Sequence, residues 1–182
     1  MTMRHFLIPV LVLAFLAVSC GKDQAASTYS QQESNIESIV QSLTGNNDST
    51  TVDYLDGSVR VTVVHGEGEA LKEGGTVTMK YAGYRVSGSS LDADNLFVTN
   101  DKDFAESSNW TVTDSSVFKT DSFKLDDETF VKGLKTGMVG VKAGDECVIL
   151  FSGKHGFGKH TTGVVPGKSA LAYHLWISSV SN

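Results

Sequence analysis

The chain has 182 residues, of which 40% are hydrophobic and 20% are charged, and its formal net charge is −6. This length accommodates one domain, or one domain with a tail. Nucleic acid and anionic lipid surfaces both repel an acidic protein, so neither is expected as the main partner. No basic run outside the extreme N-terminus offsets the negative charge.

Residues 1–19 have the pattern of an export signal. Arg4 gives a positive start, and the apolar run 6–18 follows it. This run is short for a bilayer span and typical of a signal peptide. It leads into Ala17-Val18-Ser19-Cys20, which resembles the lipobox of bacterial lipoproteins. The resemblance implies that Cys20 carries a lipid; the alternative is an ordinary secretory signal with a cysteine near its cleavage site by chance.

A lipid on Cys20 would attach the protein to a membrane of the bacterial cell envelope. Gly21 follows the cysteine, at the place where an Asp would retain a lipoprotein in the inner membrane, so the outer membrane is expected. Cys147 is then the only thiol of the mature chain, and it has no partner for an intramolecular disulfide. It stands in the apolar run 147–151, which predicts a small buried hydrophobic residue.

Two segments precede the domain. Residues 20–33 are polar, rich in small residues and without periodicity, which predicts a flexible tether. Residues 34–45 predict a short amphipathic helix, because Ser34 and Glu37 have capping-box spacing and Gly45 ends the pattern. Its apolar face consists of Ile36, Ile39, Val40 and Leu43. We expect this face to dock on the domain, and binding of a partner is the alternative.

Residues 52–182 predict an α+β domain. Asp56-Gly57 has the composition of a two-residue hairpin turn. The runs that alternate with period two, and are expected to be extended, are 59–64, 76–86, 146–152 and 169–180. In the last run, the residues that share one face are Leu171, Tyr173, Leu175 and Ile177. Only 129–136 looks helical in this half, with Gly137 as its expected stop. We therefore expect an antiparallel sheet wrapped around one short helix.

Four fragments of residues 59–178 carry a resemblance to a known family. They are Gly66-Glu67-Gly68 with the step 72–75, Phe130-Val131-Lys132-Gly133-Leu134, Gly144-Asp145, and Phe157-Gly158 with Val164-Val165-Pro166. Each fragment is weak alone, but their order and spacing resemble the FKBP-type peptidyl-prolyl cis-trans isomerases. The resemblance implies an FKBP-like sheet and a shallow apolar pocket that holds a proline ring.

The resemblance also implies the site residues. The implied catalytic residues are Tyr81, Asp92, Phe130, Val131, Phe157 and Tyr173. The implied substrate-binding residues are Leu91, Phe123, Leu134, Val164 and Val165. Asp92 matches the acidic residue that follows the family's second strand. The backbone N–H of Val131 matches the group that donates to a ligand carbonyl.

Several positions depart from the family pattern. The substitutions are Leu134 for the Trp that floors the pocket, Leu91 for Phe, Phe157 for Tyr and Tyr173 for Phe. They keep the pocket apolar but reduce its ring area, which implies weakened or altered ligand binding. The chain also carries an insertion at about 95–122. Its apolar residues 96–98 predict a cover over one sheet edge, and a substrate-selecting flap is the alternative.

Nucleotide and metal sites receive little support. Residues 153–160 nearly match a phosphate-binding loop, but His160 stands where a Ser or Thr would hold magnesium. Only 22 residues follow it, too few for a parallel-sheet nucleotide domain. His155 and His160 have no further ligands nearby in the sequence, so neither a metal nor another cofactor is expected.

The expected function is isomerisation of X–Pro bonds, as a folding helper for exported proteins. Rotation about a peptide bond meets a barrier of about 18–20 kcal/mol, and no bond is broken. A pocket without nucleophile or base can therefore catalyse it, by binding the twisted amide better than the planar one. The expected partners are proline-containing polypeptides. The alternative is a non-catalytic proline- or partner-binding module on the same scaffold.

Overall fold

The computed structural model describes residues 19–45, 48–110 and 115–182, and side chains from residue 24 onward. Residues 1–18 of the predicted export signal lie outside this part of the chain. Within it, seven strands form one sheet in the order β1-β2-β6-β7-β3-β4, and β5 also pairs with β3. The strands are β1 Thr51–Leu55, β2 Ser58–Val64, β3 Thr76–Val86, β4 Leu96–Thr99, β5 Asp121–Lys124, β6 Glu146–Phe151 and β7 Ala170–Ser181.

The strand pairs are all antiparallel, and the helices are short apart from the first. The α-helices are α1 Ser19–Thr44, α2 Lys102–Ser107 and α3 Lys132–Met138, and the 3-10 turns are η1 Ala93–Asn95 and η2 Ser115–Val117. The predicted α+β class and the four predicted extended runs are confirmed. The hairpin is confirmed too: Leu55 pairs with Ser58, and Gly57 has a φ of 87° that favours glycine.

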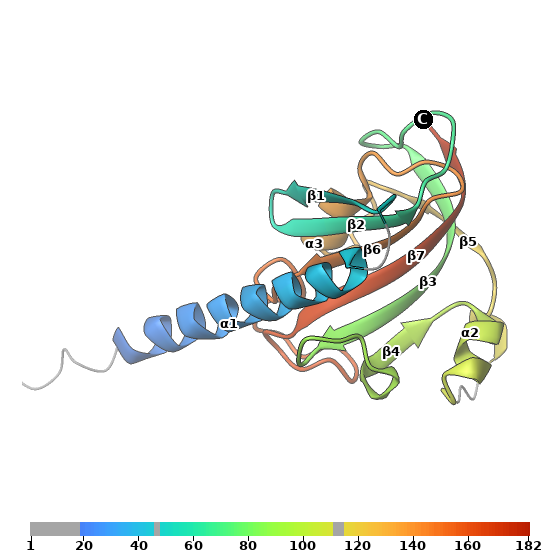
Figure 1. Cartoon of the computed structure of the whole chain (residues 1–182). Helices are drawn as coiled ribbons and strands as arrows, with labels where there is room; N and C mark the ends of the chain where they lie inside the picture. The colour runs from blue at the N-terminus through green and yellow to red at the C-terminus, as the bar shows by residue number, and fades with distance from the viewer. Residues whose placement is uncertain (1–18, 46–47, 111–114) are drawn as a thin grey trace, which may run out of the picture.

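Helices α1 and α3 lie on opposite faces of the sheet (Figure 1), and each face carries its own hydrophobic cluster. On one face, Leu134 and Met138 of α3 pack with Leu171 and Leu175 of β7. On the other face, the apolar stripe of α1 packs on the alternate residues of the same strands, such as Ala172. The predicted sharing of a face by the four residues of β7 is therefore confirmed. The apolar face of α1 packs on the sheet of the same domain, as predicted.

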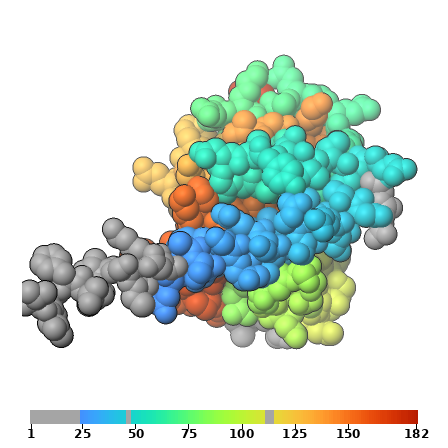
Figure 2. All heavy atoms as spheres, turned by 60° about the vertical axis from the view of Figure 1, so that its left-hand side comes forward, coloured from blue at the N-terminus to red at the C-terminus, as the bar shows by residue number. Residues whose placement is uncertain are grey.

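The prediction of a tether at 20–33 before a helix at 34–45 is wrong, because α1 is one helix over Ser19–Thr44. Ser34 is not its N-cap: its hydroxyl donates to the carbonyl of Ser30, four residues earlier (3.1 Å). The sequence between residues 22 and 44 contains neither glycine nor proline, so nothing local stops the helix. The apolar period starts only at Ile36 because the preceding turns have no sheet beneath them (Figure 1). The turns that follow lie along the surface of the domain (Figure 2).

Helix α3 also differs from its prediction. It begins at Lys132 and continues to Met138, so Gly137 lies inside it and is not its stop. A Cβ on Gly137 would lie 2.2 Å from a methyl group of Ile149, which shows that this glycine permits close packing on β6. The end of the helix is held by Arg60 of β2, whose guanidinium donates to the carbonyls of Gly137 and Val139 (3.0 and 2.6 Å).

The insertion at 95–122 covers the free edge of β3, as predicted. Strand β4 pairs with residues 82–84 of β3, and β5 pairs with residues 76–79 of the same edge. Helix α2 follows β4 and places Phe104 against Tyr84 and Trp176 on the α1 side of the sheet. The insertion is therefore folded against both the edge and one face of the sheet.

Asn100 fills the gap between β4 and β5 along the edge of β3. Its side-chain oxygen accepts from the N–H of Tyr81 (2.7 Å), and its amide donates to the carbonyls of Met79 (3.1 Å) and Lys119 (2.9 Å). The residue is only 2% exposed. One side chain thus satisfies three backbone groups that the two short strands leave unpaired.

Asn100→Ala is expected to lower the free energy of unfolding by about 3 kcal/mol, because three buried backbone groups lose their partners. Urea denaturation of the full chain in mild detergent measures the change. Asn95→Ala is the matched control, since that amide bonds the Ser87 hydroxyl at the surface. Equal midpoints for the two variants would contradict the role assigned to Asn100.

Candidate functional site

A cavity of about 330 Å³ opens on the α3 face of the sheet. Five segments form its wall: β3, β4, β5, α3 with Phe130 before it, and the loop between β6 and β7, while β7 lies beneath. The residues that line it are Met79, Tyr81, Phe97, Val98, Phe123, Phe130, Leu134, Phe157, Thr162, Gly163, Val164, Val165 and Tyr173. None of these side chains carries a charge.

Most of the residues expected from the resemblance meet at this cavity. Those that line it are Tyr81, Phe123, Phe130, Leu134, Phe157, Val164, Val165 and Tyr173. Val131 does not line it, but packs partly buried against the same cluster and is the N-cap residue of α3. Within the described part of the chain its N–H forms no hydrogen bond, so this donor is free at the start of the helix.

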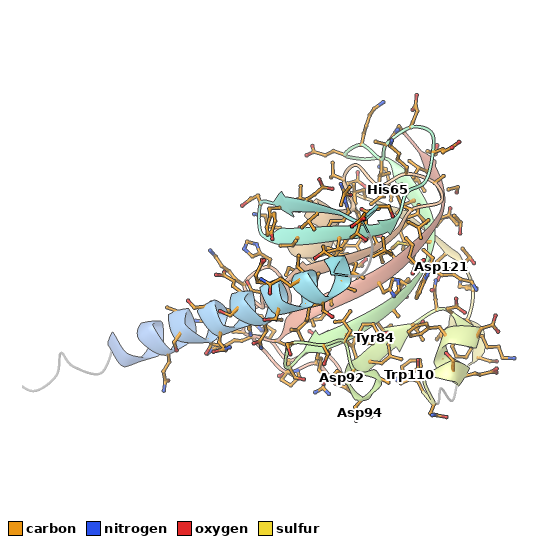
Figure 3. The ribbon with its side chains drawn as sticks, viewed as in Figure 1. His65, Tyr84, Asp92, Asp94, Trp110 and Asp121 are labelled. Carbon is orange, nitrogen blue, oxygen red and sulfur yellow. The ribbon has the colours of Figure 1, made fainter. Side chains whose placement is uncertain are left out.

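Leu91 and Asp92 are exceptions, and their assignment to the pocket is wrong. Leu91 packs against the cluster on the α1 side of the sheet. Asp92 begins η1, where its carbonyl accepts from Asn95 and its carboxylate accepts from the Ser90 hydroxyl (both 2.9 Å). Figure 3 shows Asp92 beside Asp94 in the turn that leads into β4. The turn after β3 is longer than the resemblance assumed, so the pocket strand begins later.

Phe97 occupies the pocket position expected of Leu91. Its ring meets that of Tyr173 edge to face, with centroids 5.9 Å apart and planes at 87°. The next residue is Val98, which also lines the pocket, so an apolar side chain stands where an acid was expected. Sequence reasoning placed Phe97 in the edge cover. The signal that could have found it is an aromatic residue inside an apolar run directly after a turn.

Aromatic contacts join the segments of the wall. Tyr81 meets Phe123 with centroids 6.0 Å apart, and Phe123 meets Phe130 at 5.2 Å, both edge to face. On the other side Tyr173 stacks on Phe151, with planes at 13°. Such pairs each stabilise by roughly 0.5–1.5 kcal/mol beyond their buried area. The rings therefore fix the shape of the cavity.

Two phenols, those of Tyr81 and Tyr173, belong to the wall. Burial raises the pKa of Tyr173 far above its usual value, and Tyr81 adds to the effect. Burial also raises the pKa of Tyr81, with a further contribution from Asp121, which Figure 3 labels on β5. Both hydroxyls therefore stay neutral at physiological pH and are able to donate hydrogen bonds.

Tyr173 is one of the residues that line the cavity. Its hydroxyl makes no hydrogen bond with any described residue, and the only buried side-chain oxygens without a partner in that part of the chain belong to Thr50 and Ser58. The Tyr173 oxygen is therefore accessible, although the residue is only 9% exposed. A ligand acceptor that enters the cavity meets this hydroxyl.

The loop between β6 and β7 forms the rim. It supplies Phe157 and residues 162–165, of which Val164 is 72% exposed and Val165 is buried. The N–H of Gly133 in α3 donates to the carbonyl of His155 (2.9 Å), which ties this loop to the helix. The near-match to a phosphate-binding loop at 153–160 consists of turns within this rim.

The described part of the chain offers neither a metal site nor a membrane-spanning helix. Residues 19–45, 48–110 and 115–182 include no group of three His, Cys, Asp or Glu side chains close enough to hold a metal ion. No helix in the same ranges combines the length and apolar character that a bilayer span requires. Burial raises the pKa of Cys147 to about 12, in line with the predicted buried thiol.

Together, the antiparallel sheet, the short helix across it and the apolar cavity between them define an FKBP-like α+β domain. A family model described as FKBP-type peptidyl-prolyl cis-trans isomerase matches residues 67–177, which is more than half of the chain. The chain belongs to this family. A comparison with curated proteins gave no match.

Solved structures share the fold at low sequence identity. A peptidyl-prolyl cis-trans isomerase from Pseudomonas syringae is 15% identical with a TM-score of 0.58, and the match covers 87% of this chain and 96% of that one. FkpA from Escherichia coli is 18% identical with a TM-score of 0.56, over 90% of this chain and 65% of that one. The three FKBP domains of wheat FKBP73 give 19% and 0.56, over 72% and 50%. This chain thus spans half of the solved wheat chain and 65% of the solved FkpA chain.

Tyr173→Phe is expected to weaken the binding of a proline-containing peptide about threefold to tenfold, because a carbonyl in the pocket loses its donor. Fluorescence titration with a labelled Ala-Leu-Pro-Phe peptide measures the dissociation constant. Tyr54→Phe is the control, since that phenol bonds Glu37 outside the cavity. Tighter binding by Tyr173→Phe would mean that a ligand covers the hydroxyl without pairing with it.

Proposed function

We propose that this protein is a peptidyl-prolyl cis-trans isomerase that acts on exported proteins in the bacterial cell envelope. The observation that carries the proposal is the cavity bounded by Tyr81, Phe130 and Tyr173, because it is apolar, aromatic and free of charged side chains. Membership of the FKBP family supports the same activity.

The cavity suits the chemistry of amide rotation. The planar X–Pro amide is conjugated and more polar than the twisted form, so a dry site disfavours the planar form relative to the twisted one. A thousandfold acceleration requires about 4 kcal/mol of such preference. Neutral donors at Tyr173 and Val131 are able to hold the flanking carbonyls while the bond turns. No step needs a nucleophile, a base or a cofactor.

A second candidate is a non-catalytic proline-binding module on the same scaffold. Leu134 at the pocket floor and Val98 in place of an acid favour it, because both reduce the features that the resemblance implied for a catalyst. The two candidates differ in one measurable property. A binding module captures proline peptides without accelerating their isomerisation, whereas the proposed enzyme does both.

Phe130→Ala is expected to lower kcat/KM for a proline tetrapeptide at least tenfold, because the variant loses a ring that contacts Phe123 and closes one wall. A protease-coupled isomerisation assay of the full chain in mild detergent measures the rate. Val64→Ala, at a 49% exposed position outside the cavity, is the control and is expected to keep the wild-type rate. If the wild type bound the peptide but did not isomerise it faster than the uncatalysed rate, the proposed enzyme would be rejected and the binding module would remain.

We also propose that the chain is a lipoprotein anchored through Cys20 in the outer membrane. Support comes from the apolar run 6–18, the lipobox resemblance and Gly21 after the cysteine. Since α1 runs from Ser19, a helix of about 24 Å separates Cys20 from Ile36, the first buried residue of the stripe, at 1.5 Å per residue. The anchor would then hold the domain at a set distance from the bilayer.

Cys20→Ser is expected to abolish labelling by radioactive palmitate in a bacterial host and to release the protein from the membrane fraction. The physical reason is that the lipid is the proposed source of membrane affinity. Ser27→Ala, on the exposed part of α1, is the control and is expected to remain lipidated. Palmitate labelling that persists in Cys20→Ser would contradict the anchor.

A further inference from the structure

Gln32 links helix α1 to the loop that forms the pocket rim. Its side-chain amide donates to the carbonyl of Lys168 (2.6 Å), and its side-chain oxygen accepts from the N–H of Gly153 (2.9 Å). The two bonds cross 136 and 121 residues of sequence. One glutamine therefore joins both ends of the segment 153–168 at once.

The two ends of this segment lie against each other. A Cβ on Gly153 would lie 2.3 Å from the carbonyl oxygen of Lys168, so only glycine permits this approach. Lys168 has a φ of 65°, an uncommon conformation for a side-chain-bearing residue. The segment is thus a compact loop whose two ends, Gly153 and Lys168, form a narrow neck. Gln32 forms a hydrogen bond with each of these two residues.

This loop carries a large part of the cavity. Phe157 and residues 162–165 lie between the two neck residues and line the pocket. The loop also has its own bonds, including that from the N–H of Gly158 to the carbonyl of Gly153 (3.2 Å). The two hydrogen bonds of Gln32 restrict how far the ends of the loop can separate. They therefore also restrict where the rim residues lie.

Gln32 stands where α1 leaves the domain. It lies one turn before Ile36, which is 5% exposed and begins the buried stripe. The hydrogen bonds of Ser27, Thr28 and Gln31 stay within the helix. Figure 1 shows α1 extending past the end of the sheet on this side, and Figure 2 shows the coloured part of the helix lying along the surface of the domain.

We infer that Gln32 is a positioning residue for the proline pocket, through which α1 holds the rim loop in its binding conformation. The inference rests on the proposed function for its kinetic consequence. Without the two bonds the loop visits more conformations, and a substrate must order it on binding. Such a cost falls equally on the ground state and the transition state, so KM rises while kcat stays unchanged.

The test compares Gln32→Ala, Gln32→Glu and the control Gln31→Ala in the full chain in mild detergent. Gln31 is the neighbouring residue in α1. Its side-chain amide donates to the side-chain oxygen of Asn35 in the same helix. Gln32→Ala is expected to raise KM about tenfold with kcat within twofold. Gln32→Glu keeps the acceptor for Gly153 but sets a carboxylate oxygen against the carbonyl of Lys168, so KM is expected to rise at least as far as in Gln32→Ala. Gln31→Ala is expected to match the wild type.

Amide hydrogen exchange supplies a readout that does not need activity. In Gln32→Ala the amides of 153–168 are expected to exchange faster, while those of β3 and β7 keep their wild-type rates. Unchanged exchange in the loop, or a uniform increase over the whole domain, would overturn the inference. A wild-type chain without isomerase activity would reject the proposed enzyme instead, and loop exchange with peptide titration would still decide the role of Gln32.

Discussion

The edge of β3 is the constraint on which the pocket depends. This strand pairs with β7 along one edge. Along the other edge it pairs with two short strands, with β4 at residues 82–84 and with β5 at residues 76–79. Asn100 and Thr99 occupy the gap, with the Thr99 hydroxyl donating to the carbonyl of Tyr81 (2.7 Å). Because buried backbone groups are costly to leave unpaired, these side chains are what allow both strands to share one edge. Phe97 and Phe123 reach the same cavity only through that arrangement.

A pocket of this kind differs from an acid–base site in how the fold must support it. Proton transfer needs a positioned acid or base with a pKa near the working pH, whereas rotation about an amide needs a shaped, dry volume. The ring contacts of Tyr81, Phe123 and Phe130 supply the shape, and the buried phenol of Tyr173 supplies a neutral donor. Val98 in place of an acid leaves this shape and this donor unchanged, although it removes a feature that the resemblance implied for a catalyst.

The sequence predicted what local periodicity encodes. The alternation in β3 and β7, the Asp56-Gly57 turn and the buried stripe of α1 all follow from residues that are neighbours in the chain. The sequence did not predict the features that depend on the length of a turn or on contacts between residues far apart in the chain. Asp92 was assigned to the pocket because an apolar–acidic pair stood at the expected spacing, whereas the turn is longer and Phe97 arrives later. Asn100 and Gln32 left no sequence signal, because each satisfies backbone groups that only the folded chain brings near.

The replacement of the expected tether by one continuous helix changes how the anchor and the pocket relate. A flexible tether would isolate the domain from forces and positions at the membrane. A continuous α1 carries Cys20 at one end, Gln32 where the helix meets the rim loop and Ile36 where it becomes buried. If the protein is anchored as proposed, a tilt of the exposed end of α1 strains the Gln32 hydrogen bonds before it disturbs the buried stripe, because these bonds lie closer to the exposed end.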